Sequence, residues 1–223
     1  VRRIRWERVG GRIAEQAKRG QFGTVKLLID SDGDGRMDKA HVWADRLPPC
    51  YGMLPLRDGL VVVCAPDILF LADRDGDGRA EVRETLLTGF RREFIERGIN
   101  NPRWGLDNWI YVGSGGDGGT IRGPHLKTPV KLGRTDFRIK ADGSAIEPVT
   151  GTVRTFGWGM NATGDRFTTA GGTPVSANLP LPYRYLGRNP FVASPAVAYT
   201  ASNYNRVFGI SPPHPWRVVR GRD

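Results

Sequence analysis

The sequence predicts an all-β fold built from many short strands. Its 223 residues include 30 glycines and 16 prolines beside 39% hydrophobic residues, a composition typical of globular chains that turn often. Apolar segments of strand length alternate with turn residues along most of the chain, and helical periodicity occurs only near residues 12–18 and 91–97. Two sequence patterns also recur at intervals typical of repeated groups of strands.

The expected strands are rich in β-branched and aromatic residues and are bounded by turn residues. In chain order they are residues 24–29, 39–44, 60–65, 68–72, 109–114, 136–141, 165–170, 206–211 and 216–220. Between Cys50 and Cys64, the stretch YGMLPLRDGLVVV predicts two strands joined by a turn at Asp58 and Gly59. This hairpin would bring the two thiols close together, which leaves open either a single disulfide or two buried free thiols.

Two pairs of similar segments define the repeated unit. Residues 30–38 (DSDGDGRMD) return 43 residues later as residues 73–81 (DRDGDGRAE), each time after an apolar strand. Residues 104–112 (WGLDNWIYV) return 54 residues later as residues 158–169 (WGMNATGDRFTT). Repeats of about 40–50 residues that contain several strands are typical of propeller blades, which bury their faces against one another. The pattern therefore predicts a β-propeller of the six-bladed type, incomplete in this chain, with about four to five blades.

The charge distribution divides the chain into two parts. Residues 1–22 form a basic amino-terminal lead-in, and residues 23–223 form the expected propeller domain, truncated at the carboxy terminus. The net charge of +10 comes from scattered arginines without a zinc-finger, RNP or helix-turn-helix pattern, which favours a solvated basic surface over a nucleic-acid partner. No apolar run approaches the roughly 20 residues of a membrane-spanning helix, and this chain contains no signal-peptide stretch.

The first acidic loop (residues 30–38) and the second acidic loop (residues 73–81) crowd like charges together in an otherwise basic chain. Carboxylates at positions 1, 3 and 5, a backbone carbonyl at position 7 and an acid at position 9 or 12 are the ligand pattern of a calcium cage. The alternative is a polar hairpin turn in which the aspartates accept hydrogen bonds from backbone amides. The expected calcium ligands are Asp30, Asp32, Asp34 and Asp38 in the first loop, and Asp73, Asp75, Asp77, Glu81 and Glu84 in the second.

The order of motifs along most of the chain resembles a known family. Residues 23–90, followed by RWGLDNWIYVGSGGDGG, GRTDFRIKADGSAIEPVTG and YLGRNPFVASPAVAY, resemble the membrane-bound dehydrogenase domain of planctomycete and verrucomicrobial proteins. That family is similar to soluble quinoprotein glucose and sorbosone dehydrogenases. The resemblance implies an exported six-bladed propeller that uses pyrroloquinoline quinone and calcium to oxidise a sugar or an alcohol. It also implies a c-type cytochrome domain or protein as the electron acceptor.

The resemblance assigns roles to three residues of this chain. It places Asn101 where such enzymes carry a histidine base, Asp117 at the acidic position after the following strand, and Asn161 at a cofactor-side asparagine. A neutral amide cannot accept a substrate proton as imidazole can. No haem-attachment motif occurs in the chain, and Asp117 and Asn161 are also typical turn residues.

Two functions follow as hypotheses. The first is a quinone-dependent sugar or alcohol dehydrogenase, and the second is a calcium-stabilised, non-catalytic propeller that binds carbohydrate or protein. The departure at Asn100 and Asn101 and the short chain predict that the isolated polypeptide is inactive. An incomplete ring also exposes apolar blade faces, which predicts self-association.

Overall fold

The computed structural model describes residues 20–93, 98–150, 155–170, 173–178, 181–186, 188, 191, 198–201 and 212. Within these residues the fold is all-β, as predicted, and the one helix described is the four-residue α2 (Tyr183–Leu186). The helical periodicity near residues 12–18 lies outside the described residues, and residues 91–93 are not helical. No helix in the described part of the chain is long and apolar enough to cross a membrane.

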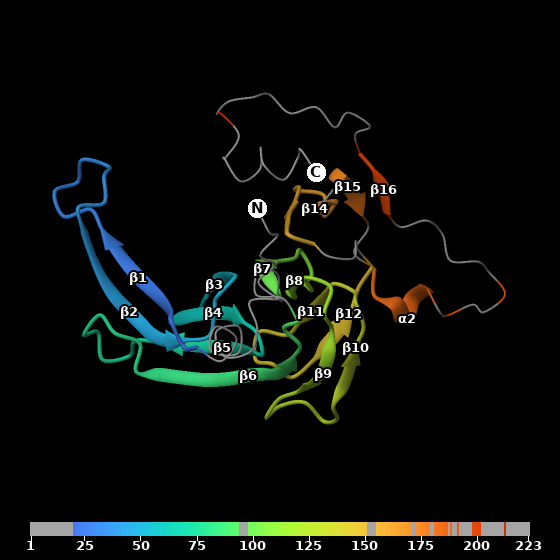
Figure 1. Cartoon of the computed structure of the whole chain (residues 1–223), viewed down its shortest axis with the longest axis horizontal. Coiled ribbons are helices and arrows are strands. Elements are labelled where there is room, and N and C mark those ends of the chain that lie inside the picture. Colours follow the sequence, from blue (N-terminus) through green and yellow to red (C-terminus); the bar gives the residue numbers. More distant parts are fainter. Residues whose placement is uncertain are drawn as a thin grey trace, which may run out of the picture.

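The strands form four separate antiparallel sheets, none of which closes on itself within the described residues (Figure 1). A two-stranded sheet joins β1 (Gly23–Ile29) to β2 (Lys39–Leu47). The next sheet, called here the central sheet, has the order β10-β9-β6-β5-β4-β3. Its strands are β3 (Gly52–Leu56), β4 (Gly59–Cys64), β5 (Asp67–Ala72), β6 (Val82–Phe90), β9 (Gly119–Arg122) and β10 (Val130–Leu132).

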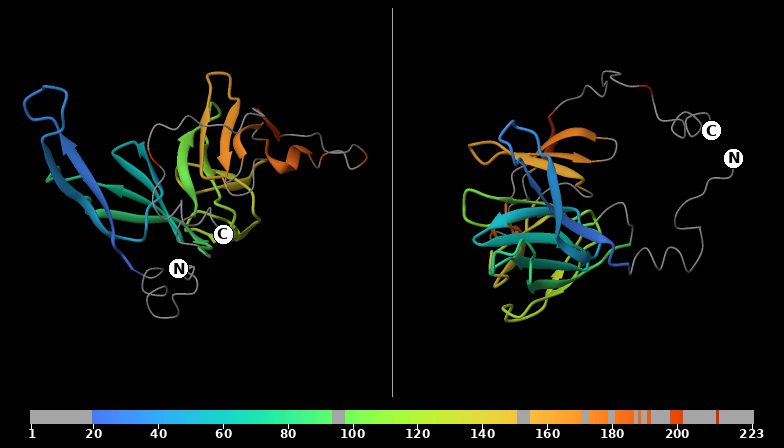
Figure 2. Two further views of the ribbon diagram at one scale, coloured as in Figure 1. Left: turned by 45° about the horizontal axis from the view of Figure 1, so that its top comes forward. Right: turned by 90° about the vertical axis from the view of Figure 1, so that its left-hand side faces the viewer.

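Two four-stranded sheets complete the described fold. The third sheet has the order β12-β11-β8-β7, and its strands are β7 (Asn100–Trp104), β8 (Ile110–Gly113), β11 (Phe137–Ile139) and β12 (Ile146–Pro148). The fourth has the order β13-β14-β15-β16, and its strands are β13 (Gly157–Met160), β14 (Arg166–Ala170), β15 (Thr173–Asn178) and β16 (Ala198–Thr200). The chain passes from the β1–β2 hairpin through the central and third sheets to the fourth, and between β8 and β11 it returns to the central sheet as β9 and β10 (Figures 1 and 2).

The predicted strands at 24–29, 39–44, 60–65, 68–72, 109–114, 136–141 and 165–170 coincide with β1, β2, β4, β5, β8, β11 and β14. The predicted strands at 206–211 and 216–220 lie outside the described residues. The sequence reading missed β6, although this nine-residue strand is the central sheet's link to β9. Its charged first half pairs with the apolar β5, so the neighbouring strand, and not local propensity, makes it a strand.

The turn between β3 and β4 lies one residue earlier than predicted. Leu56 pairs with Gly59, so the two turn residues are Arg57 and Asp58, and Arg57 takes the positive φ of 53°. Gly59 is instead the first residue of β4. A side chain would not fit there, because a Cβ would lie 2.1 Å from the carbonyl oxygen of Leu71 on β5. The glycine therefore serves the close approach of β4 and β5 and not the turn.

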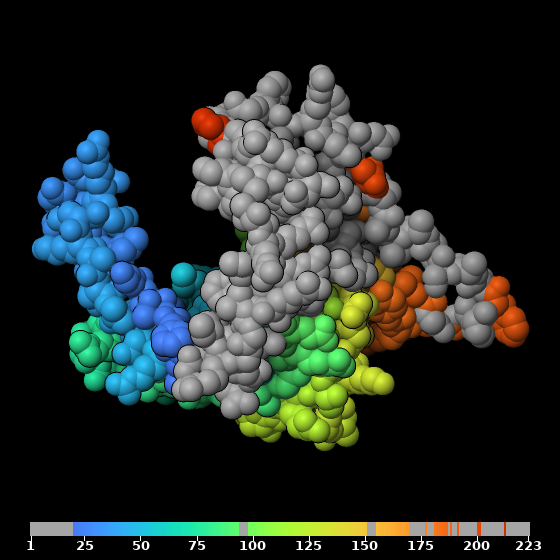
Figure 3. Space-filling view, in the orientation of Figure 1, coloured from blue at the N-terminus to red at the C-terminus, as the bar shows by residue number. Residues whose placement is uncertain are grey.

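Alternate residues of the central sheet are buried on both of its faces. Val61 and Val63 belong to the cluster that the central sheet shares with the third sheet, in which the rings of Phe90 and Phe137 stack 5.2 Å apart. Val62 belongs to a second cluster, formed with the β1–β2 hairpin. The sheets are therefore packed face to face, whereas the outer part of the hairpin projects from the molecule (Figure 3).

Candidate functional site

The first acidic loop joins β1 to β2 and is organised around one carboxylate. Asp30 Oδ1 accepts a hydrogen bond from the Gly33 amide at 2.8 Å, and Oδ2 accepts one from the Gly35 amide at 2.9 Å. Both glycines have positive φ, 78° and 86°, a conformation that other residues adopt at a cost. The hydrogen bond from the Gly35 amide, with a further one from Gly33, lowers the pKa of the Asp30 carboxyl, although desolvation opposes this.

Asp38 closes the same loop from its far end. Its Oδ1 accepts a hydrogen bond from the Ser31 amide at 2.9 Å, and its Oδ2 accepts one from the Ser31 hydroxyl. The hydroxyl hydrogen bond, and then the amide, lowers the pKa of the Asp38 carboxyl. In the middle of the loop, Asp34 Oδ1 accepts from the Arg36 amide at 2.7 Å. The loop is thus ordered by its own aspartates, as the polar-turn alternative also expects.

The second acidic loop, between β5 and β6, repeats this hydrogen-bond scheme position by position. Asp73 accepts from the amides of Gly76 and Gly78 at 2.8 and 2.9 Å, as Asp30 does from its two glycines. Asp77 Oδ1 accepts from the Arg79 amide at 2.7 Å. Glu81 takes the place of Asp38, because its carboxylate accepts from the amide of residue 74 at 3.0 Å. The two loops therefore share one geometry as well as one sequence pattern.

In each loop three carboxylates converge enough to hold one ion. The oxygens of Asp30, Asp32 and Asp34 lie within 4.8 Å of one another, and so do those of Asp73, Asp75 and Glu81. Several carboxylate oxygens at such separations suit a hard cation such as calcium. The donor sets of both loops therefore fit calcium.

The remaining expected ligands lie differently. Asp38 and Asp77 fall outside the two convergent groups, so the third carboxylate is at position 5 in the first loop and at position 9 in the second. Glu84 lies inside the β6 ladder opposite Phe70, where it lines a surface pocket with Arg57 and His125. The structure thus groups Glu81, and not Glu84, with the aspartates of the second loop.

The second acidic loop is attached to the β1–β2 hairpin that carries the first. The Ala80 amide donates a hydrogen bond to the Trp43 carbonyl oxygen at 2.7 Å. His41, which lies on β2, packs against Gly78, since a Cβ at Gly78 would lie 2.9 Å from the imidazole Nε2. The hairpin and the second loop therefore support each other structurally.

Asn100 and Asn101 lie on β7 and connect neighbouring sheets. The Asn101 side-chain amide donates to the Trp158 carbonyl oxygen at 2.7 Å, and its backbone amide donates to Tyr51 at 3.3 Å. The Asn100 side-chain amide donates to the carbonyl oxygen of Thr155 at 2.8 Å. Both side chains therefore join β7 to the segment around β13. The position that the resemblance treats as catalytic thus has a structural role.

Asp117 and Asn161 hold turns at separate places. Asp117 is 5% exposed in the loop after β8, and its Oδ2 accepts from the Glu93 amide at 2.9 Å. Asn161 Oδ1 accepts from the amides of Thr163 and Asp165, at 3.1 and 2.8 Å, in the turn between β13 and β14. Each of the three residues singled out by the resemblance thus has partners of its own in the described structure.

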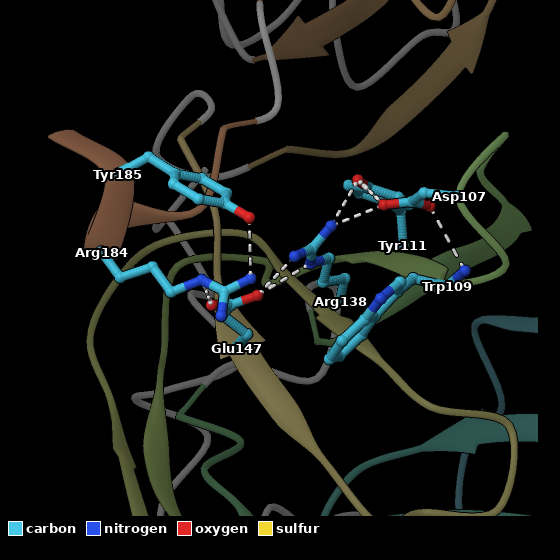
Figure 4. Close-up of polar contacts among 7 residues, drawn as sticks. All are labelled: Asp107, Trp109, Tyr111, Arg138, Glu147, Arg184 and Tyr185. Atoms are coloured by element: carbon cyan, nitrogen blue, oxygen red, sulfur yellow. Dashed lines mark hydrogen bonds and ion pairs between the residues drawn. The ribbon is translucent and has the colours of Figure 1, made fainter.

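A cluster of charged and aromatic side chains was not anticipated from the sequence. It lies over β8, β11, β12 and α2 (Figure 4) and consists of Asp107, Trp109, Tyr111, Arg138, Glu147, Arg184 and Tyr185. Arg138 is at its centre, 2.5 Å from Asp107 and 2.6 Å from Glu147, with its guanidinium 4.3 Å from the Trp109 ring centroid. The register explains the grouping, since Arg138 pairs with Tyr111 on one side and Glu147 on the other.

A second unanticipated group is an ion pair with no exposure to solvent. Arg166 Nη2 lies 2.7 Å from Asp136 Oδ2, and both side chains are 0% exposed. Asp136 also accepts from the Ser114 amide and the Thr155 hydroxyl, each at 2.8 Å. Burial lowers the pKa of Arg166, and the charge of Asp136 opposes that effect. In the sequence, Asp136 and Arg166 each lie at the beginning of a predicted strand, and nothing in the sequence pairs them.

Comparison with known proteins assigns the chain to a family without an assigned activity. No curated protein and no solved structure matches it significantly. The family described as a domain of unknown function (DUF7133) matches residues 11–221, which is most of the chain, so the protein belongs to that family.

Proposed function

We propose that this chain is a calcium-stabilised scaffold of the β-propeller type, which is the non-catalytic alternative of the two hypotheses. The observation that carries the proposal is the repeated geometry of the acidic loops: each contributes three carboxylates whose oxygens lie within 4.8 Å. Bound calcium would neutralise the mutual repulsion of these carboxylates and hold the hairpins in place. The expected ligand of the scaffold, a carbohydrate or a protein, stays a prediction.

The strand order supports the assignment of the sheets as propeller blades. In the fourth sheet four consecutive strands lie in chain order from one edge to the other, and β3 to β6 do the same in the central sheet. The third sheet keeps this order, with β9 and β10 inserted between β8 and β11 and paired onto β6 of the central sheet. The first strands of these sheets adjoin, since β7 contacts both β3 and β13. The β1–β2 hairpin corresponds to the last two strands of a further blade. These features are those of four blades of an incomplete ring.

The blade assignment gives the acidic loops a common place. Each joins the third strand of a blade to the fourth, and the corresponding turn of the third sheet is residues 140–145. There Asp142 accepts a hydrogen bond from the Ser144 amide at 3.0 Å, but no group of three convergent carboxylates is found at this turn among the described residues. Residues 140–145 therefore make the same connection between strands as the two acidic loops, but they lack the three convergent carboxylates that would hold a cation.

Calcium binding is tested by thermal unfolding and titration calorimetry of the whole chain. Calcium at about 100 times its dissociation constant should stabilise the fold by about 2.7 kcal/mol for one site, and a chelator should remove the effect. Asp30→Asn and Asp73→Asn should each remove one binding event, whereas Asp142→Asn should leave calcium binding unchanged. A melting temperature that does not respond to calcium, together with no heat of binding, would establish the plain-turn alternative.

The quinone-dependent dehydrogenase, its sugar or alcohol substrate, its c-type cytochrome partner and its export stay predictions of the resemblance. Asn101, Asp117 and Asn161 do not fit a quinone pocket, because each is engaged in hydrogen bonds that hold β7 or a turn, and Asn161 is exposed. We therefore derive no catalytic step from them. A dye-reduction assay with pyrroloquinoline quinone, calcium and a panel of sugars and alcohols should give no turnover, and turnover by the monomeric chain would reverse the choice between the two functions.

A further inference from the structure

The two cysteines of the chain are neighbours in the fold. Cys64 ends β4 and belongs to the buried cluster between the central sheet and the β1–β2 hairpin, and Cys50 packs against that cluster. The ladder continues beyond β3, because the Tyr51 amide donates to the Val63 carbonyl oxygen at 3.0 Å. This pairing places Cys50 beside the end of β4, where its thiol donates a hydrogen bond to the Pro48 carbonyl oxygen at 3.1 Å, while the Cys64 thiol donates one to the Val62 carbonyl oxygen at 3.9 Å.

The two thiols differ in accessibility and acidity. Cys50 is partly exposed, whereas Cys64 is completely buried. The neighbouring Cys64 lowers the pKa of the Cys50 thiol, although burial opposes this. The neighbouring Cys50, together with burial, raises the pKa of the Cys64 thiol. Cys50 is therefore the thiol that a reagent in solution reaches, and it is also the one that ionises first.

We propose that Cys50 and Cys64 form a reversible dithiol–disulfide site that is oxidised by small disulfides such as oxidised glutathione. The Cys50 thiolate attacks one sulfur of the oxidant, which forms a mixed disulfide and releases one glutathione thiolate. Cys64 then loses its proton and attacks the Cys50 sulfur, which forms the internal S–S bond and releases the second glutathione. The protein loses two electrons and two protons, and the S–S bond of the oxidant is reduced to two thiols.

The second step is favoured by the first. Once Cys50 carries the mixed disulfide, it is no longer an anion beside Cys64, so one of the influences that raise the pKa of Cys64 is removed while burial remains. Cys64 belongs to the buried cluster against which Cys50 packs, so the sulfur that it must attack lies at the same cluster. Its burial also protects the mixed disulfide from competing thiols on that side.

The disulfide would secure the joint between the β1–β2 hairpin and the central sheet. The segment between Leu47, at the end of β2, and Gly52, at the start of β3, contains Cys50. The start of β1 lies directly on this segment, since a Cβ at Gly23 would be 2.4 Å from the Pro48 carbonyl oxygen and 3.2 Å from Cys50 Sγ. A covalent bond from Cys50 to Cys64 would fix this segment to β4 and restrict the unfolded chain.

The experiment compares the full chain reduced by a phosphine with the same chain incubated with oxidised glutathione under native conditions. Oxidation should lower the intact mass by two hydrogen atoms, protect both cysteines from alkylation after unfolding, and give a Cys50–Cys64 linked peptide. The melting temperature of the oxidised chain should exceed that of the reduced chain by roughly 5–10 °C.

Single variants separate the two steps. Cys64→Ala should keep glutathione on Cys50 as a stable mixed disulfide, whereas Cys50→Ala should leave the buried Cys64 unmodified in the folded chain. The double variant C50A/C64A should show no response of its melting temperature to the oxidant. A persistent mixed disulfide in the wild-type chain, a disulfide between two chains, or two thiols that both alkylate after oxidation would overturn the proposal.

Discussion

The charge on Arg166 is compensated chiefly by Asp136. The Nε and Nη1 groups of the buried guanidinium have no hydrogen-bond partner in the described structure, and the Trp158 ring lies 4.5 Å from it. Removal of one partner from a buried ion pair leaves the other charge without compensation in a medium of low dielectric. This pair is therefore a site at which one side chain has a large effect on the stability of the whole fold.

Asp136→Asn should lower the free energy of unfolding by about 3–5 kcal/mol. Asp45→Asn is the matched control, because Asp45 forms a 3.2 Å ion pair with Arg83 in which both side chains are substantially exposed. The control should cost no more than about 1 kcal/mol. Urea unfolding followed by circular dichroism measures both. Equal losses in the two variants would show that burial does not strengthen the Asp136–Arg166 pair.

At the scale of the element, the pairing of β4 with β5 depends on the absence of a side chain at Gly59. A Cβ there would lie 2.1 Å from a backbone carbonyl oxygen of β5, so the two strands would have to separate. Gly59→Ala should destabilise the chain by about 1–3 kcal/mol. Gly133→Ala, where no atom lies within 4 Å of the added carbon, should change the stability by less than about 1 kcal/mol in thermal unfolding. A neutral Gly59→Ala would contradict the described register of β4 and β5.

The first acidic loop should loosen in acid when calcium is absent. Its hydrogen bonds lower the pKa values of Asp30 and Asp38 below the ordinary value of 3.8, so the folded loop favours the ionised carboxylates. The stabilisation is present above pH 3.8 and is lost as the pH falls through the lower pKa values of the folded loop. Nuclear magnetic resonance titration should show the Gly33 and Gly35 amide signals changing below pH 3.8, with the Asp30 carboxyl.

Asp30→Asn provides the control for this titration. The variant should keep a change linked to Asp38 and lose the change at Gly33 and Gly35. If the two glycine amides titrate unchanged in the variant, the loop is not organised around Asp30.

At the scale of the whole molecule, the β1–β2 hairpin leaves apolar side chains in solvent. Leu27, Leu28 and Val42 are 43%, 54% and 40% exposed, and the hairpin is a two-stranded sheet beside larger ones. Exposed apolar strands with unpaired edges favour association between chains. The chain should therefore self-associate in a concentration-dependent manner in light scattering.

Leu28→Lys should reduce this association, because it places a charge in the middle of the exposed strand. Leu106→Lys is the matched control, since Leu106 is 71% exposed but lies in the turn between β7 and β8. A monodisperse wild-type chain, or equal effects of the two variants, would contradict a role of the hairpin in association.

Local sequence alone determined the all-β class, eight of the described strands and the composition of the acidic loops. These features depend on side-chain alternation, turn glycines and the spacing of carboxylates over nine residues, all of which act between near neighbours in the chain. The equivalent roles of Asp30 and Asp73 could likewise be inferred from the repeat, because similar sequence patterns between strands produce corresponding hydrogen bonds.

The tertiary structure alone decided which distant groups meet. Glu84 satisfies the sequence pattern of a calcium ligand, but a strand advances by about 3.3 Å per residue, and the pairing of β6 with β5 carries Glu84 away from the loop. Asn101 was singled out as a catalytic position, whereas sheet packing turns its amide toward Trp158 on β13. The Asp136–Arg166 pair joins residues of two sheets, and its energy comes from the exclusion of water, which only the packed sheets provide.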